Sequence, residues 1–218
     1  MKLLKRLSYC YSLKRMKQQN NIQMPVLKRF QVYVFGTGNT VFIAPEIKHL
    51  SGYIRIYGNN NTVYIQKGYD MKLNIDIGSS VTRTANECLL TIGKNLYCGM
   101  THIMIGENHS ILEIGDDCMF SDNIDIYATD GHTVLNLNNE ITNIGHSVRI
   151  KNHVWLGKDV KIGKNTLISD NSIVGWGAVV TKKFTQNNII IAGNPASVVK
   201  KGVNWDRAFP NSYINRKS

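Results

Sequence analysis

The sequence predicts an all-β solenoid, a parallel β-helix whose triangular coils have three short faces. Seven consecutive six-residue units cover residues 144–185, and each unit begins with an aliphatic residue. The residue four places later is small or β-branched in six of the seven units, and glycine holds the second place in four. A period of six matches neither a helix, at about 3.6 residues per turn, nor a strand that alternates between two faces. It matches a coil in which each face takes one unit.

The first residue of each unit is predicted to point inward and to stack on its counterparts in the neighbouring coils. These residues are Ile144, Ile150, Leu156, Ile162, Ile168, Val174 and Val180. The same phase extends back through Ile126, Phe120 and Ile114, and between the two stretches it meets His132. Residues 132–143 are polar and rich in asparagine. A protruding loop is therefore predicted to leave the coil there.

Irregular early coils are predicted before this ladder. The segment 36–43 recurs as 58–65, and both copies place Gly and Asn directly before an alternating strand. After the last unit the repeat decays into a turn at residues 193–195. The predicted organisation is a β-helix domain over residues 30–185, followed by a closing turn and C-terminal cap over residues 186–218. A cap is expected because the open end of a solenoid exposes unpaired strand edges.

Residues 1–29 form a basic N-terminal segment, predicted to hold a short helix over residues 1–24. It carries eight Lys or Arg residues and no acid, within a formal net charge of +11. Charges interrupt its leucines, which argues against a signal peptide, and no run approaches the ~20 apolar residues of a transmembrane helix. The predicted roles are a solvated helix that supports oligomerisation, or contact with anionic lipid or an acidic glycan. Nucleic-acid binding is disfavoured, because no basic patch with interleaved aromatic residues accompanies a known binding fold.

The four cysteines show neither a CxxC pair nor metal-ligand spacing. They are Cys10, Cys88, Cys98 and Cys118. Cys118 falls on an inward position, so core packing explains it. Free thiols without a secretory signal favour a cytoplasmic protein, with the inner face of the membrane as a further place of contact. No metal site is predicted.

Three segments resemble the hexapeptide-repeat acyltransferase superfamily. Residues 127–132 (Tyr-Ala-Thr-Asp-Gly-His) are similar to its Asp-x-His segment, and residues 152–157 (Asn-His-Val-Trp-Leu-Gly) to its Asn-x-Val-Trp-Ile-Gly unit. Residues 191–200 resemble its closing segment. Within the superfamily the chain resembles bacterial O-acetyltransferases of capsular polysaccharide, including those acting on polysialic acid. The resemblance implies a left-handed β-helix, acetyl-CoA as donor, a sugar or polysaccharide acceptor, and a homotrimer with active sites between adjacent β-helices.

Acetyl transfer from a thioester to a hydroxyl requires a base that titrates near neutral pH, and histidine fits that role. His132 is favoured among the six histidines because it replaces an aliphatic residue in the register, where a polar loop begins. Spacing alone leaves a turn histidine equally open, and the resemblance assigns His132 as the catalytic base. Asp130, two residues earlier, is predicted to orient the imidazole, with turn initiation at Gly131 as the alternative.

Trp155 stands at a corner position that is predicted to point outward. By resemblance it lies beside the thioester, where its indole N–H would hydrogen-bond the departing sulfur; packing on a neighbouring subunit is the alternative. Trp176 is predicted to pack on a subunit or a loop. His146 and His153 fall on outward positions and are predicted to be solvated or to lie at an interface.

Coenzyme A carries phosphates that require cations near the open end of the solenoid. Lys183 and Lys200 are predicted for that role, with an ordinary solvated face as the alternative. Gly175, Ala178 and Pro195 are predicted, together with the corner tryptophan, to border the pantetheine arm.

Three other functions remain open on the sequence. The first is acetylation of a small acceptor, such as an antibiotic or a nucleotide sugar. The second is a metal-dependent hydratase of the γ-carbonic-anhydrase kind, which uses the same fold with His ligands about five residues apart. Here the later histidine pairs, 132/146 and 146/153, lie fourteen and seven apart, which disfavours it. The third is a purely structural or surface-binding β-helix.

Overall fold

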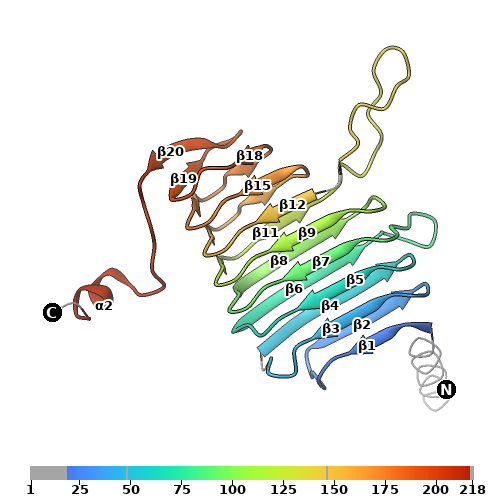
Figure 1. Cartoon of the computed structure of the whole chain (residues 1–218), viewed down its shortest axis with the longest axis horizontal. Helices are drawn as coiled ribbons and strands as arrows, with labels where there is room; N and C mark the ends of the chain where they lie inside the picture. The colour runs from blue at the N-terminus through green and yellow to red at the C-terminus, as the bar shows by residue number, and fades with distance from the viewer. Residues whose placement is uncertain (1–18, 48, 146, 217–218) are drawn as a thin grey trace.

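The strands wind into triangular coils that stack into a prism (Figure 1). The computed structural model describes residues 19–47, 49–145 and 147–216. Strands in successive coils pair in parallel, which confirms the predicted parallel β-helix. Within the described residues, the antiparallel strand pair is the last one, between β19 (Ile189–Ala192) and β20 (Ser197–Lys201).

One sheet forms the first face of the prism. From the N-terminal end its strands are β1 (Asn21–Gln23), β3 (Thr40–Ile43), β5 (Thr62–Ile65), β7 (Leu89–Ile92), β9 (Ile111–Ile114), β12 (Ser147–Ile150), β15 (Thr166–Ile168) and β18 (Lys183–Phe184).

The other sheet bends over the second and third faces. Its second-face strands are β10 (Met119–Phe120), β13 (Trp155–Leu156), β16 (Ile173–Val174), β19 and β20. Its third-face strands are β2 (Phe30–Phe35), β11 (Ile124–Tyr127), β14 (Lys161–Ile162) and β17 (Val179–Val180). The long strands β4 (His49–Tyr57), β6 (Asp70–Ile77) and β8 (Tyr97–Ile105) bend over both faces. The start of β8 pairs with β10 and its end with β11.

Each coil therefore has three edges, and the predicted catalytic residues lie at two of them. The third–first edge lies between strands such as β11 and β12, and the first–second edge lies between strands such as β12 and β13. Backbone turns at these edges use left-handed conformations that suit Asn, Asp and His. Asn165, Asn171 and His153 adopt them, with φ of 58°, 57° and 54°. Corner residues thus point side chains outward without breaking the ladder.

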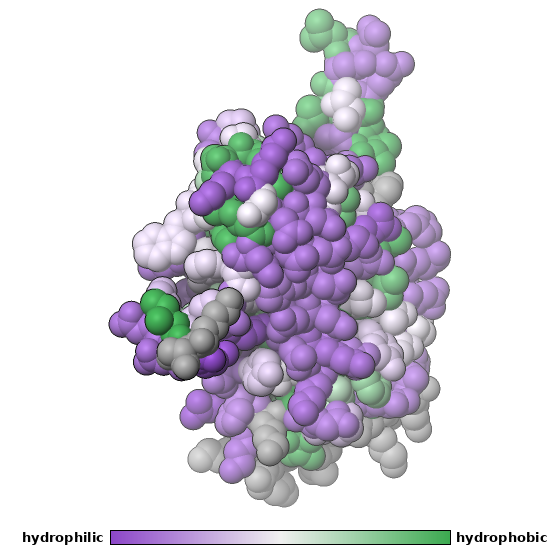
Figure 2. Space-filling view, turned by 60° about the vertical axis from the view of Figure 1, so that its left-hand side comes forward, coloured by the Kyte–Doolittle hydropathy of each residue, from purple (hydrophilic) through white to green (hydrophobic). Residues whose placement is uncertain are grey.

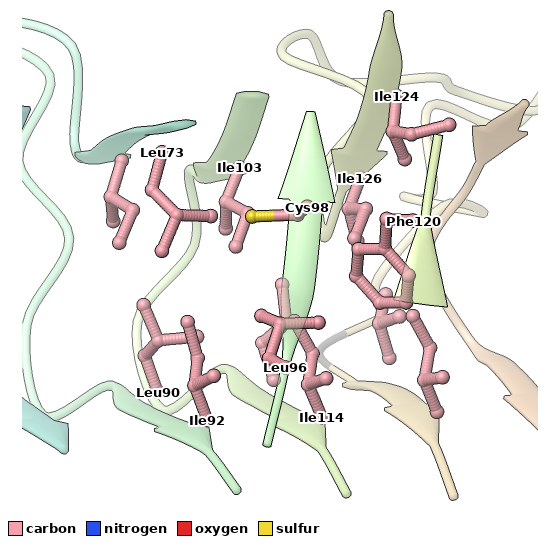
Figure 3. Packing of buried hydrophobic residues seen from close by; sticks show 14 of the residues in the cluster. Leu73, Leu90, Ile92, Leu96, Cys98, Ile103, Ile114, Phe120, Ile124 and Ile126 are labelled. Carbon is pink, nitrogen blue, oxygen red and sulfur yellow. The ribbon is translucent and has the colours of Figure 1, made fainter. Parts of the chain in front are cut away.

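The interior of the prism is a continuous stack of aliphatic side chains (Figure 3). All six predicted inward positions from Ile150 to Val180 are at most 2% exposed. Burial of this kind contributes about 25 cal/mol per Å² of apolar area removed from water. Ile144 is the exception to the predicted ladder, since it is 63% exposed. It belongs to the end of the loop, and the coil resumes only at β12.

Both ends of the β-helix differ from the predicted boundaries. The first strand, β1, pairs with β3, so the prediction of a helix is wrong at residues 21–23 and the coils begin before residue 30. Residues 1–18 of the basic segment lie outside the described residues. At the other end, β19 pairs in parallel with β16, so the coils continue beyond residue 185. The predicted cap is β20, followed by an extended segment and the short helix α2 (Pro210–Ile214).

The predicted protruding loop leaves the third–first edge between β11 and β12 (Figure 1). A bridge between Leu135 and Ile141 and a hydrogen bond from the Asn136 backbone N–H to the Glu140 carbonyl oxygen hold its two arms together. Figure 2 shows apolar side chains on this loop, which stands away from a largely hydrophilic body. Leu137, at its tip, is fully exposed.

Three cysteines of the described residues lie in the core of the prism as free thiols. Cys88, Cys98 and Cys118 are buried and unpaired, which confirms the inward position predicted for Cys118. Burial raises the pKa of the Cys88 thiol to about 11, so these thiols stay protonated and unreactive. Among the described residues, no helix is long and apolar enough to cross a membrane.

Candidate functional site

A cavity of about 630 Å³ opens at the third–first edge, beside the base of the protruding loop. Three excursions of the chain surround it: the turn after β6, the turn after β8 and the loop after β11. The lining includes Arg83, Glu107, Thr129, His132, Ile141 and Asn143. Basic, acidic and apolar groups therefore meet in one hollow on an otherwise regular prism.

His132 forms part of the wall of this cavity and is exposed to solvent. Its backbone is fixed, because the Asn143 side-chain amide donates to the His132 carbonyl oxygen at 2.8 Å. The turn before it is held by a 2.9 Å hydrogen bond from the Gly131 N–H to Thr129 Oγ1. In the described part of the chain, no side chain hydrogen-bonds the imidazole. The ring is thus free to take a proton from a molecule that enters the cavity.

Asp130 does not make the predicted contact with the imidazole. Its Oδ2 lies 2.8 Å from the Lys164 ammonium and accepts a 2.8 Å hydrogen bond from Asn143. The hydrogen bond from Lys164 and then that from Asn143 hold the pKa of Asp130 below its usual range. Asp130 therefore stays ionised and closes the base of the loop. Its physical role is to fix the backbone that carries His132.

Lys164 and Glu107 were not predicted from the sequence. Lys164 lies on the turn between β14 and β15, with its side chain only 12% exposed. Its ammonium reaches the Asn143 carbonyl oxygen, Asp130 and, at 4.0 Å, Glu107. The Glu107 carboxylate in turn accepts a 3.3 Å hydrogen bond from Thr129. Edge residues in successive coils stack on one another, so their register could have indicated Lys164 as a neighbour of the loop.

Trp155 begins β13 on the second face and is half-buried. Its Nε1 is buried and, among the described residues, has no hydrogen-bond partner. An unpartnered buried N–H is costly, by roughly 1–3 kcal/mol, and such groups call for an explanation. The indole N–H is therefore a hydrogen-bond donor whose acceptor is not among the described residues.

His132 and Trp155 lie on different edges of the prism. His132 precedes β12, and Trp155 follows it, so the whole first face separates them. A single chain therefore does not bring the two predicted catalytic residues into one site.

The predicted donor-binding residues fall into two groups. Gly175 lies close to the turn at residues 193–196, which contains the cis Asn194–Pro195 bond. The Gly175 N–H donates to the Ile191 carbonyl oxygen, just before this turn, and the Ala196 N–H donates to the Val179 carbonyl oxygen. Ala178 lies in the same corner, but its methyl group is buried, so only its backbone can border a ligand. Lys183 on β18 and Lys200 on β20 are both exposed, on different faces at the C-terminal end of the prism.

The other corner residues divide similarly. Trp176 lies outside the coil and is 77% exposed, so it does not make the predicted packing contact with a loop of its own chain, and packing on another subunit stays a prediction. His153 is not solvated: its side chain is 24% exposed and stacks beneath Trp205 of the C-terminal segment. His146 lies outside the described residues.

A polysialic acid O-acetyltransferase of Neisseria meningitidis is 35% identical to this chain over 183 residues, which cover 84% of this chain and 82% of the relative. The chain belongs to the hexapeptide-repeat O-acetyltransferase family. A galactoside O-acetyltransferase of Escherichia coli (strain K12) is 33% identical over 118 residues, covering 54% of this chain and 57% of the relative. A scan against protein-family profiles found no match.

Solved structures support the same assignment of this O-acetyltransferase. The polysialic acid O-acetyltransferase OatWY superimposes with a TM-score of 0.72 and 30% identity, covering 91% of this chain and 94% of that structure. The polysialic-acid-specific acetyltransferase NeuO gives a TM-score of 0.65 at 22% identity, covering 88% of this chain and 100% of that structure, and shows the shared fold. That fold is the left-handed parallel β-helix, as predicted.

Proposed function

We propose that this O-acetyltransferase transfers an acetyl group from acetyl-CoA to a sugar hydroxyl of an acidic capsular or surface polysaccharide. The observation that carries the proposal is the free imidazole of His132 in the wall of a 630 Å³ cavity. The names of the relatives support the acceptor class, since two of them act on polysialic acid.

In the proposed reaction, neutral His132 takes the hydroxyl proton as the sugar oxygen attacks the thioester carbonyl. The C–O bond forms, the tetrahedral intermediate collapses, and the C–S bond breaks. The imidazolium then returns the proton to the departing thiolate. Transfer is direct, without an acetyl-enzyme, and general-base catalysis of this kind contributes about 10²- to 10⁴-fold.

A second chain completes the proposed site. Because the first face separates His132 from Trp155, a homotrimer would place the third–first edge of one β-helix against the first–second edge of the next. Trp155 of that neighbour would then donate its unpartnered N–H to the sulfur. The negative charge on sulfur grows in the transition state, so this hydrogen bond stabilises that state more than the bound thioester.

The proposed donor groove continues towards the C-terminal end of the prism. Gly175, the backbone of Ala178 and Pro195 would border the pantetheine arm, since their corner presents little side-chain bulk. Lys183 and Lys200 would face the phosphates of coenzyme A. Both lysines are exposed and positively charged, which suits an anionic group held near the surface.

Arg83 supports an acidic acceptor. It lies on the turn after β6 and lines the cavity opposite the loop. Its guanidinium has no side-chain partner in the described part of the chain, whereas planar carboxylates are the groups that Arg binds in two-pronged fashion. Acetylation of a small acceptor, such as an antibiotic or a nucleotide sugar, is the second candidate, and the phosphates of a nucleotide sugar would also suit Arg83. Membership of the O-acetyltransferase family displaces the hydratase.

The proposal is tested by thiol release from acetyl-CoA, with and without an acidic capsular polymer. For the wild type, we expect the polymer to stimulate release; for His132→Ala, we expect the stimulated rate to fall by ~10²-fold or more. His49→Ala is the matched control, because His49 is exposed, pairs with Asp70 and does not line the cavity. Stimulation that survives His132→Ala would contradict the assignment of the base. Release stimulated by small sugars alone would favour the second candidate.

A further inference from the structure

A short strap runs along the first–second edge of the prism after β20, past corner residues of several coils. We define the strap as residues 203–207. At its start, Val203 exchanges two hydrogen bonds with Asn188: its N–H donates to the backbone oxygen at 3.0 Å, and its carbonyl oxygen accepts from the side-chain amide at 2.9 Å. At its end, the Arg207 guanidinium donates to Asp117, to Asn95 and to the carbonyl oxygen of Cys118, at 3.0 Å each. The strap is therefore tied to the β-helix on both sides.

Trp205 fills the middle of the strap and packs on His153. Its ring is stacked on the imidazole at a centroid distance of 4.2 Å and an interplanar angle of 8°. The Trp205 indole N–H donates to the His153 carbonyl oxygen at 2.9 Å, and His153 Nε2 lies 3.1 Å from the Trp205 carbonyl oxygen. Trp205 is only 9% exposed. Backbone, ring face and ring nitrogen of His153 are thus all held by one residue.

Asp117 completes the anchor beneath His153. Its Oδ2 lies 2.7 Å from His153 Nδ1, and its Oδ1 accepts from Arg207. Although burial opposes ionisation, hydrogen bonds from His153 and Arg207 hold the pKa of Asp117 below its usual range. Both partners of the imidazole nitrogens, a carboxylate and a carbonyl oxygen, are acceptors. His153 is fixed from two directions.

His153 and Trp205 together control the surroundings of Trp155. His153 is two residues before Trp155 and holds the edge turn in a left-handed conformation, with φ 54°. Such a conformation costs a non-glycine residue energy, and it persists where neighbours enforce it. The Trp205 ring also lies against the Trp155 ring, at 6.1 Å between centroids and a tilt of 48°. His153 thus fixes the backbone that precedes Trp155, and Trp205 covers one side of the Trp155 indole ring.

We infer that Trp205 is a positioning residue for acetyl transfer: through His153 and by ring contact it fixes the orientation of the Trp155 indole, whose N–H is proposed to bond the thioester sulfur. This inference rests on the proposed function of Trp155. A hydrogen bond to sulfur is directional, so an indole that can rotate loses the contact most when charge develops in the transition state. The loss should appear in kcat, with KM for acetyl-CoA little changed.

A double-mutant cycle between Trp205→Ala and Trp155→Phe tests the inference. Both substitutions alone are expected to lower kcat, Trp205→Ala by roughly tenfold to 100-fold. In the Trp155→Phe background, Trp205→Ala should lower kcat no further, because the N–H that it positions is already gone. A strap that only stabilises the fold would instead multiply the two losses. All rates are compared well below the melting temperature of the least stable variant.

Two further variants support the double-mutant cycle, one as a substitute for Trp205→Ala and one as a control. Trp205→Phe keeps a ring on His153 but removes the N–H donor; it carries the same cycle if Trp205→Ala does not fold, and a smaller loss in kcat is expected. Phe209→Ala is the matched control, since Phe209 is a highly exposed aromatic residue just beyond the strap. It should leave kcat unchanged.

The outcomes distinguish a failure of the Trp205 inference from a failure of the proposed role of Trp155. If Trp155→Phe leaves kcat unchanged, the role of Trp155 in the proposed function fails, and the inference fails with it. If Trp155→Phe lowers kcat while Trp205→Ala has no effect or multiplies the loss, only the inference is overturned.

Discussion

Lys164 lies 2.8 Å from Asp130, across the base of the loop that carries His132. The two residues come from different coils, and Asn143 bridges them by bonding both the Asp130 carboxylate and the His132 carbonyl oxygen. The six-residue repeat itself does not require a charged pair at this edge. The ion pair therefore holds the base of the loop in place. It favours a structural role for Asp130 over direct orientation of the His132 imidazole.

Asp130→Asn is expected to lower kcat by less than tenfold. The carboxylate faces Lys164 rather than the imidazole, so its loss loosens the loop without changing the tautomer of His132. An aspartate that orients the imidazole would instead cost about 10⁴-fold. Steady-state rates across pH 5–9 measure the difference, with Asp70→Asn, an exposed aspartate outside the cavity, as control. A loss near 10⁴-fold would contradict this role for Asp130.

Two inactive variants are expected to restore activity when they are mixed. His132→Ala and Trp155→Ala chains, unfolded together and refolded, should form mixed trimers in which a site receives both native residues from adjacent chains. Random assembly gives about a quarter of the sites this composition. Activity near a quarter of the wild type would support sites between chains. Co-refolding either variant with itself is the control, and no recovery in the mixture would place both residues in one chain's site.

Asp76 is expected to contribute stability that disappears in acid. Its carboxylate is 7% exposed and bonds His102, Arg55 and Tyr53. Burial opposes ionisation, but these partners hold the pKa of Asp76 below its usual range. Its stabilisation is therefore full above the unfolded-state value, near pH 4, and is lost as the pH falls through the lower folded-state value.

Urea unfolding measures this contribution in the wild type and in Asp76→Asn. At pH 7 we expect the variant to be less stable by about 1–3 kcal/mol, with the gap narrowing below about pH 3. Asp70→Asn, whose side chain is 70% exposed, is the control and should show no gap. A gap that is equal at pH 7 and pH 3 would argue against the ionised form as its source.

Gly52→Ala is expected to destabilise the prism by roughly 3 kcal/mol or more. Gly52 has φ +111°, and a Cβ there would stand 2.0 Å from the Leu73 carbonyl oxygen in the next coil. Backbone cannot give way without breaking the ladder. Gly202→Ala is the matched control: its φ is +68°, with open space around it, so it should cost about 1 kcal/mol. Melting temperatures of both variants measure the contrast.

The core of the fold was predictable because one side chain in each unit must be buried. Ile150 and Val180 follow that rule, and the same rule failed at Ile144, where the period continued through a loop that no longer packs. A twelve-residue excursion keeps the phase of a six-residue repeat. Periodicity therefore could not tell a coil from a loop there, although the asparagine-rich composition could.

The candidate site was predictable only in part. The polar His132 in an apolar register marked the cavity from the sequence. The direction of the Asp130 carboxylate was not predictable, because it depends on Lys164 in another coil. His153 was predicted to be solvated or to lie at an interface, and the first of these is wrong, since Trp205, more than fifty residues later, covers it. Register could have indicated that Lys164 lies near the loop, but not that it binds Asp130, and the strap contacts leave no trace in the local sequence pattern.

The antiparallel strand β20 has a consequence for growth by addition of chains. A β-helix with parallel strands at its end offers a template on which another copy could continue the same register, coil upon coil, into a fibre. Here β20 runs against β19 and presents Lys200 and Lys201, both exposed. A parallel strand of another copy meets reversed hydrogen-bond geometry and positive charge at this point. Continuation of the coils by another copy is therefore disfavoured on the second face at this end of the prism.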